Sequence, residues 1–188
     1  FKDDEVLFYL YSPGGLSVVE DADVAAAQLA PLIVQQSGVG DFDLTELERV
    51  LAGKDVSLSP FLGEVEEGFS GSASPQDLET LFQLLYLYST QPRSDAEAFT
   101  TFQRQVEEYL KNRALSPQTA LDDRYLELFC GDDPRCNVIK VYEQVQDVDL
   151  ERALALYRER LGNLEGANVL LVGAFDVDTV TQLAQTYL

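Results

Sequence analysis

Histidine is absent from the 188 residues of this chain. Its absence removes the usual general base of enzymes, the Ser-His-Asp and Cys-His arrangements, and the commonest zinc ligand. A cysteine nucleophile would need another group to activate it, and no such group is evident in the sequence. The chain therefore offers no conventional catalytic centre of its own.

Methionine is absent as well, so we expect the chain to be a processed or excised piece of a longer protein. The opening residues, FKDDE, do not resemble a signal peptide. Long hydrophobic runs are also missing. The longest candidate, VAAAQLAPLIV, is shorter than the roughly 20 residues of a membrane span and contains Gln28 and Pro31.

Basic residues are scarce, with 13 Lys and Arg against 33 Asp and Glu, which gives a net charge of -20. Such a charge repels nucleic acid and anionic membranes, so we expect no nucleic acid and no membrane among the partners. A solvated acidic surface is the simplest interpretation. Attraction of basic peptides is the alternative.

Only two cysteines occur, Cys130 and Cys136, within CGDDPRCN. Their spacing suits neither a zinc ribbon nor a redox C-x-x-C motif. Gly131 and Pro134 favour a turn between them, so we predict that the two Cα atoms lie within the about 7 Å that a disulfide requires. A disulfide in an oxidising compartment and two reduced thiols both remain open. The acidic charge and the cysteine pair lean towards the bacterial periplasm.

The pattern of apolar residues predicts few strands and long helices. Strands are predicted at 5–12, 55–65, 67–73 and 167–175, the last, ANVLLVGAF, as a fully buried strand. Helices are predicted at 21–38, 43–53, 74–90, 94–114, 116–131, 147–162 and 176–188. This order predicts an α+β fold, a two-layer α/β sandwich in which helices lie mainly on one face of a small mixed sheet. Residues 1–188 form a single domain.

Capping residues mark where several helices begin. Asp43 and Glu46 predict a capping box, and Ser94 and Glu97 predict another. In SPQD, Ser74 is predicted as the N-cap of the next helix, followed by proline at the first helical position, and the same Ser-Pro start recurs at Ser116. Proline inside the helix at 21–38 should kink it, at a cost of about 3 kcal/mol.

Carboxylates give no convincing metal site in the sequence. Four D-x-D pairs occur, but none continues as an EF-hand, and each precedes a helix that it can cap. Asp132 and Asp133 could hold calcium in a loop, although a solvated turn is simpler. Glu107 lies four residues before Lys111, which is typical of an exposed ion pair on a helix. We therefore predict no catalytic and no metal-binding residue in this chain.

Several segments, in this order, resemble the pitrilysin/insulysin-type zinc peptidases, the inverzincins. They are SPGGLS, a helix ending in SGVG, LAGKDVSLSP, EGFSGSASPQDLETLFQLLYLYSTQPRSDAEAF and VLLVGAFDVDTVTQLAQTYL. The match runs along essentially the whole chain and is most specific from Glu67 to Phe99. The resemblance implies the fold of the mitochondrial-processing-peptidase-like metallohydrolases.

The resemblance also implies a parent peptidase of four related domains around a closed chamber. The first domain of that family carries H-x-x-E-H, with a downstream glutamate completing the zinc site. This chain is similar to the third domain. The segment that matches the metal helix reads AAAQLAPLIVQQSG, with neither histidine nor glutamate, and only Glu107 or Glu108 falls near the place of the downstream glutamate. Zinc is therefore expected in the parent's catalytic domain and no cofactor in this chain.

Three functions are compatible with these observations. The leading one is a non-catalytic chamber-wall domain of a zinc metalloendopeptidase, whose partners are the parent's other domains and peptide substrate. The alternative is a structural subunit that kept the fold and lost proteolysis, like the core proteins of respiratory complexes. A hydrolase with a metal held by carboxylates alone is disfavoured by the missing histidines.

The helix at 74–90 is apolar on more than one face. One face can pack on the sheet, and the other needs cover. We predict Tyr86, Leu87 and Tyr88 as candidate interface residues towards an adjoining domain. Cover by neighbouring helices of the same domain is the other interpretation.

Overall fold

The computed structural model describes residues 4–113 and 115–188 of the chain. Its single sheet has the strand order β2-β3-β1-β4, and every neighbouring pair is antiparallel. The α+β class and the shared sheet are therefore confirmed, whereas the expected mixed sheet is wrong. A short turn joins β2 to β3, and a short turn permits only antiparallel pairing. The strands are β1 Val6–Pro13, β2 Val56–Leu62, β3 Glu66–Ala73 and β4 Asn168–Gly173.

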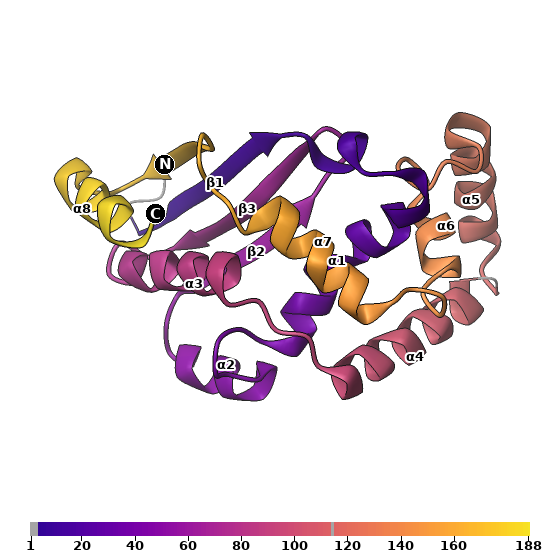
Figure 1. Ribbon diagram of the computed structural model, residues 1–188, viewed down its shortest axis with the longest axis horizontal. Helices are drawn as coiled ribbons and strands as arrows, with labels where there is room; N and C mark the ends of the chain where they lie inside the picture. The colour runs from indigo at the N-terminus through magenta and orange to yellow at the C-terminus, as the bar shows by residue number, and fades with distance from the viewer. Residues whose placement is uncertain (1–3, 114) are drawn as a thin grey trace.

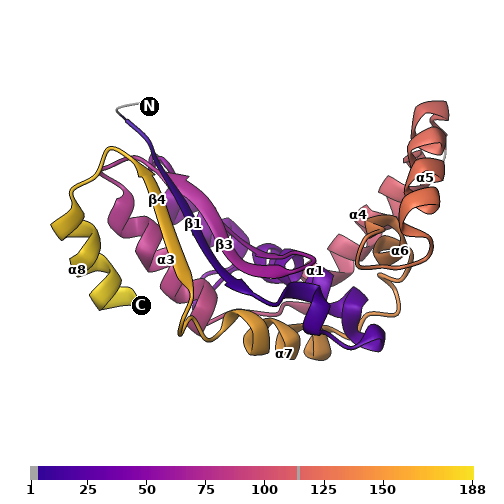
Figure 2. The same cartoon turned by 90° about the horizontal axis from the view of Figure 1, so that it is seen from above.

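Helices lie mainly on one face of this sheet, as expected. Figures 1 and 2 show α3 and α7 along that face, whereas α4, α5 and α6 gather beyond one end of the sheet. The helices are α1 Val24–Ser37, α2 Leu44–Leu51, α3 Leu78–Thr90, α4 Ala96–Arg113, α5 Pro117–Cys130, α6 Val138–Glu143, α7 Leu150–Leu161 and α8 Val177–Tyr187. Two short 3₁₀ turns, Gly15–Val18 and Asp21–Asp23, connect β1 to α1.

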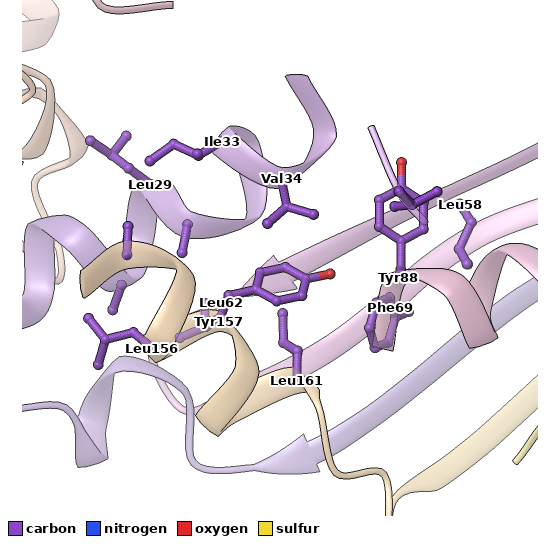
Figure 3. Close-up of a cluster of buried hydrophobic side chains, with 14 of the residues drawn as sticks. Leu29, Ile33, Val34, Leu58, Leu62, Phe69, Tyr88, Leu156, Tyr157 and Leu161 are labelled. Carbon is purple, nitrogen blue, oxygen red and sulfur yellow. The ribbon is translucent and has the colours of Figure 1, made fainter. Parts of the chain in front are cut away.

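The core lies between the sheet and these helices. Alternate residues of β1 point into it, so Val6, Phe8 and Leu10 are buried. Phe8 meets Phe82 of α3 edge to face, with ring centroids 5.9 Å apart. Figure 3 shows side chains of α1, α7 and the sheet converging around Tyr157. The chain thus builds a substantial core from its own residues.

Two predicted caps lie elsewhere than expected. The Asp43–Glu46 capping box is present, with both hydrogen bonds formed. Ser74, in contrast, is not the N-cap of α3. Its hydroxyl and the amide of Asp55 both donate to the Asp77 carboxylate, which holds Ser74–Asp77 as a turn, and the helix starts afterwards. In α4, Asp95 rather than Ser94 accepts from the first amides.

The final predicted strand is the clearest correction. β4 pairs with β1 alone and forms an edge of the sheet, with Leu170 54% exposed. It is therefore not fully buried. An apolar run indicates a strand but does not say how many of its faces are covered.

The remaining comparisons between predicted and observed elements concern individual helices. α1 continues through Pro31 without interruption, and Gly38 ends it. Ser116 caps α5 as predicted. The helix predicted at 94–114 ends at Arg113 within the described residues, and Ala114 lies outside them. The six-residue helix α6 was not predicted.

Candidate interaction surfaces

The helix that matches the metal-binding helix of the family is α1. None of its residues is charged, and ten of its fourteen residues are buried. Gln35 is half-buried and Gln36 is exposed. Amide side chains are poor zinc ligands compared with histidine, cysteine or carboxylate. The donors that α1 offers therefore do not fit a zinc ion.

The two glutamates nearest the place of the downstream zinc ligand lie on α4, which packs against α1. Glu108 pairs with Lys111 at 3.0 Å, and Glu107 accepts a hydrogen bond from Gln146 at 2.9 Å. Across residues 4–113 and 115–188, no three His, Cys, Asp or Glu side chains are grouped to hold a metal ion. Both glutamates act as surface ion-pair partners here.

The cysteine loop joins α5 to α6. The Cα atoms of Cys130 and Cys136 are 5.4 Å apart, and the structure links their sulfurs. Asp133 accepts from the amide of Arg135, so this carboxylate serves the turn. Arg135 in turn donates to the carbonyls of Leu16 and Val19 and ties the loop to the start of the chain. The geometry suits a disulfide, and its formation in solution stays a prediction.

A buried ion pair fastens β3 to α7. Glu67 is only 5% exposed and accepts two hydrogen bonds from Arg160, at 2.8 and 2.5 Å. The amide of Gly15 donates to the same carboxylate at 3.2 Å. A paired arrangement with a further donor is what a buried carboxylate requires. This pair is structural, because its carboxylate is fully engaged by the fold.

The face of the sheet opposite the helices carries an aromatic cluster. Tyr9 of β1 stacks on Phe61 of β2, with ring centroids 5.3 Å apart, and Tyr11 lies 5.6 Å from Tyr9. Leu7, on the same face of β1, is 51% exposed. Strand register places serines next to these rings, at 57, 59, 70 and 72. We call this surface the open face.

Tyr9 is held in place on the open face by a charged partner. Its hydroxyl donates to Glu66 Oε1 at 2.7 Å. The hydrogen bond to this carboxylate, together with burial, raises the pKa of Tyr9 to about 12. The ring therefore keeps its proton and its position throughout the physiological range. This face was not predicted, although the alternation of residues in EVLFYLYS places Leu7, Tyr9 and Tyr11 on one side.

A second exposed apolar surface runs along α5, which projects from the rest of the molecule (Figure 2). None of residues 117–130 is buried. Tyr125 and Phe129 are in contact, with centroids 4.5 Å apart, on the side of the helix that also carries Leu121 and Leu128. We call this surface the α5 face. These four residues are spaced i, i+4, i+7 and i+8 in the sequence, which is typical of one apolar side of a helix.

The predicted interface on α3 divides between surface and core. Tyr86 is 41% exposed, whereas Leu87 is partly buried. Tyr88 is 6% exposed and belongs to the core, so it cannot serve as an interface residue. Figure 3 draws Tyr88 within the buried cluster, together with Leu58 and Phe69 of the sheet. Tyr86 and the partly buried Leu87 stay candidates.

The structure is an α+β domain, and comparison with known proteins confirms its resemblance to the pitrilysin-type zinc peptidases. The chain is 22% identical over 188 residues to a probable zinc protease PqqL of Haemophilus influenzae, a match that covers 98% of this chain and 20% of that protein. It spans about a fifth of the length of the curated relatives it matches. No protein-family model matches the chain.

Solved structures share the fold. The crystal structure of the periplasmic protease PqqL from Escherichia coli superposes with a TM-score of 0.75 at 21% identity, over all of this chain and 20% of that one. The first half of the same protease gives 0.73 at 13% identity, over 98% of this chain and 41% of that one. A peptidase M16 inactive domain from Pseudomonas fluorescens gives 0.72 at 14% identity, over 97% of this chain and 44% of that one.

No described helix is long and apolar enough to cross a membrane, when residues 4–113 and 115–188 are considered. This agrees with the short apolar runs of the sequence.

Proposed function

We propose that the chain is a non-catalytic domain of a zinc metalloendopeptidase, forms part of the wall of its chamber, and contributes to peptide binding and inter-domain packing. One observation carries this proposal. The chain matches a fifth of a probable zinc protease along its whole length, while its α1 offers no histidine, cysteine or carboxylate. The fold is retained and the metal ligands are not.

A position in the second half of the parent is supported by the structural comparisons. Identity to the whole Escherichia coli protease is 21%, and identity to its first half alone is 13%. If the best match lay in the first half, the two values would be similar. A third-domain position explains the difference.

The two exposed surfaces suit different tasks. The open face presents aromatic rings and serines on a rigid sheet, which is a suitable support for a peptide. The α5 face presents apolar side chains on a projecting helix, which is suited to packing against another domain. The parent's remaining domains, which would also hold the zinc, are the expected partners.

A periplasmic location is part of the proposal. The Escherichia coli protease with this fold is described as periplasmic. The linked pair Cys130–Cys136 is compatible with such an oxidising compartment.

The test has two arms. The purified chain, treated with chelator and given zinc, should retain no stoichiometric metal and hydrolyse no peptide. Tight zinc binding with chelator-sensitive turnover would contradict the proposal. In the second arm, the complete parent should hydrolyse peptides, and deletion of residues 1–188 should abolish this activity. A parent without H-x-x-E-H and without hydrolysis would instead favour the structural-subunit alternative.

A further inference from the structure

A pocket of about 230 Å³ lies where α1, the edge strand β2 and α6 meet. This volume is below the about 300–1,000 Å³ that is typical of small-molecule sites. It is larger than the roughly 150 Å³ of a cavity that accommodates benzene. The pocket therefore has the size for one apolar side chain. Its apolar walls come from three elements and include Leu29, Leu32, Pro60, Phe61, Val138 and Tyr142.

One polar side chain, Gln28, belongs to the same lining. Its Oε1 atom is buried and accepts no hydrogen bond from any residue in the described part of the chain. Buried polar atoms are nearly always paired, because an unpaired one carries the full penalty of its lost hydration. A ligand whose N–H group reached this oxygen, with a small movement of the Gln28 side chain, would remove this penalty. The unpaired oxygen therefore indicates a site for a hydrogen-bond donor.

The pocket opens at the edge of the sheet. Pro60, Phe61 and Leu62 are consecutive, and consecutive strand residues point to opposite faces, yet all three line it. Only a cavity at the side of the strand can touch all of them. In the described sheet, β2 has β3 as its single neighbour. Backbone groups on the outer side of such a strand can pair with an extended peptide, while a pocket selects its side chain.

Charge decides which extended peptides approach this edge. The net charge of -20 attracts cations and repels acidic chains over distances of about 10 Å. We propose that the pocket binds one apolar side chain of an extended basic peptide and that a backbone N–H of this peptide donates to Gln28 Oε1. This inference rests on the proposed function, because it names the class of peptide that the domain contacts.

The binding test uses a defined probe on the purified chain, which has its own core. The probe is the capped peptide Ac-Lys-Thr-Phe-Thr-Lys-amide, and the matched control replaces its phenylalanine with serine. Isothermal titration calorimetry should detect the first peptide and not the second. Amide chemical-shift changes in NMR spectra should concentrate in β2, α1 and α6. Binding of both peptides alike, or shifts confined to the open face, would overturn the proposal.

Three variants separate a ligand role for Gln28 from a structural one. Gln28→Leu removes the unpaired oxygen, so the melting temperature should rise while affinity for the phenylalanine peptide falls about threefold to tenfold. Val138→Trp should fill the pocket and reduce affinity more than tenfold, at a position that is already 37% exposed. Gln36→Leu, exposed on the same helix, should leave affinity unchanged.

The outcomes are distinguishable from those of the proposed function. A higher melting temperature in Gln28→Leu with unchanged affinity would show that the oxygen is merely an unfavourable feature of the fold, and the pocket proposal would fail. Absence of any peptide binding would overturn it too. Loss of parent hydrolysis on domain deletion would still support the domain's place in the peptidase, because that result does not depend on the pocket.

Discussion

The segments that lead into helices α3 and α5 begin with the same three residues, Ser-Pro-Gln, and differ in almost everything that follows. Seven of the thirteen residues of α3 are buried, whereas no residue of α5 is. Both helices carry large apolar side chains, so their composition does not explain the difference. α3 lies against the sheet, and α5 projects beyond its end (Figures 1 and 2). One helix therefore belongs to the domain's own core, and the other stays uncovered by the described part of the chain.

The shared start also behaves differently in the two places. At both sites the serine side chain accepts from the amide three residues on, of Asp77 or of Thr119, but only at Ser116 does the helix begin at once. At Ser74 the aspartate in the corresponding position accepts from the amide of Asp55, a residue before β2. This tertiary contact, together with the Ser74 hydroxyl, delays the helix to Leu78. The local serine bond is thus present at both sites, and a residue that is distant in the sequence accounts for the difference.

Identical substitutions in the two helices should have very different effects. Phe82→Ala removes a fully buried ring that packs on Phe8, and we expect a loss of about 3–5 kcal/mol in the free energy of unfolding. Phe129→Ala removes a ring that is 71% exposed and should change stability by less than about 0.5 kcal/mol. Urea denaturation measures both. A large cost for Phe129→Ala would show that the α5 face is already covered within the chain.

Breaking a buried ion pair should likewise cost more stability than breaking an exposed one. Arg160→Met leaves the Glu67 carboxylate buried without its partner, so we expect a loss of about 3 kcal/mol. Arg124→Met breaks an exposed pair with Glu127 on α5 and should cost under about 1 kcal/mol. Chemical denaturation of the two variants provides the comparison. Equal costs would mean that the β3–α7 pair is solvated in solution.

The predicted bond between Cys130 and Cys136 should stabilise mainly the helices that it joins, α5 and α6. We expect mass spectrometry of the unreduced chain to show no free thiol and a bond between Cys130 and Cys136. Cys130→Ser and Cys136→Ser together should reduce stability by about 2 kcal/mol, since the closed loop is short. Hydrogen exchange should increase in α5 and α6 and stay unchanged in the sheet. Two free thiols in the native protein would contradict the predicted bond and leave the proximity of the residues intact.

The sequence predicted well those features that depend on periodicity. Four strands, the hairpin of β2 and β3, and every helix longer than α6 follow from runs of apolar residues and their spacing. α6 has only six residues, too few for a periodic pattern to emerge. The exposure of β4 and the burial of Tyr88 depend on which elements lie next to them in space, and a single sequence does not specify that.

The candidate surfaces were harder to predict than the fold. The prediction of no metal site rests on residue types alone, and it stays a prediction. The open face and the α5 face depend on which side of each element stays uncovered. The apolar spacing of both surfaces is present in the sequence. The other side of β1 and much of α3 show a similar spacing, however, and those residues belong to the core. The unpaired Gln28 oxygen could be found only once α6 had been placed beside α1 and β2.

The smallest expected effect is the response of Tyr9, on the open face of the sheet, to high pH. Tyr9 on the open face has its pKa raised to about 12 by Glu66, against 10.0 for an unperturbed tyrosine. A folded-state pKa above the unfolded value means that the stabilisation is fully present below about pH 10 and is lost as pH rises through about 12. Burial also raises the pKa of Tyr88 and of Tyr157, so ultraviolet titration should show several late-titrating tyrosines, and Tyr9→Phe should remove one of them. Glu66→Gln should lower the pKa of Tyr9, because a neutral amide no longer disfavours the tyrosinate. Tyr86→Phe, at an exposed position of α3, is the control and should leave the late transitions in place. A titration curve of Tyr9→Phe that has lost an ordinary tyrosine instead of a late one would show that the Tyr9–Glu66 hydrogen bond does not form in solution.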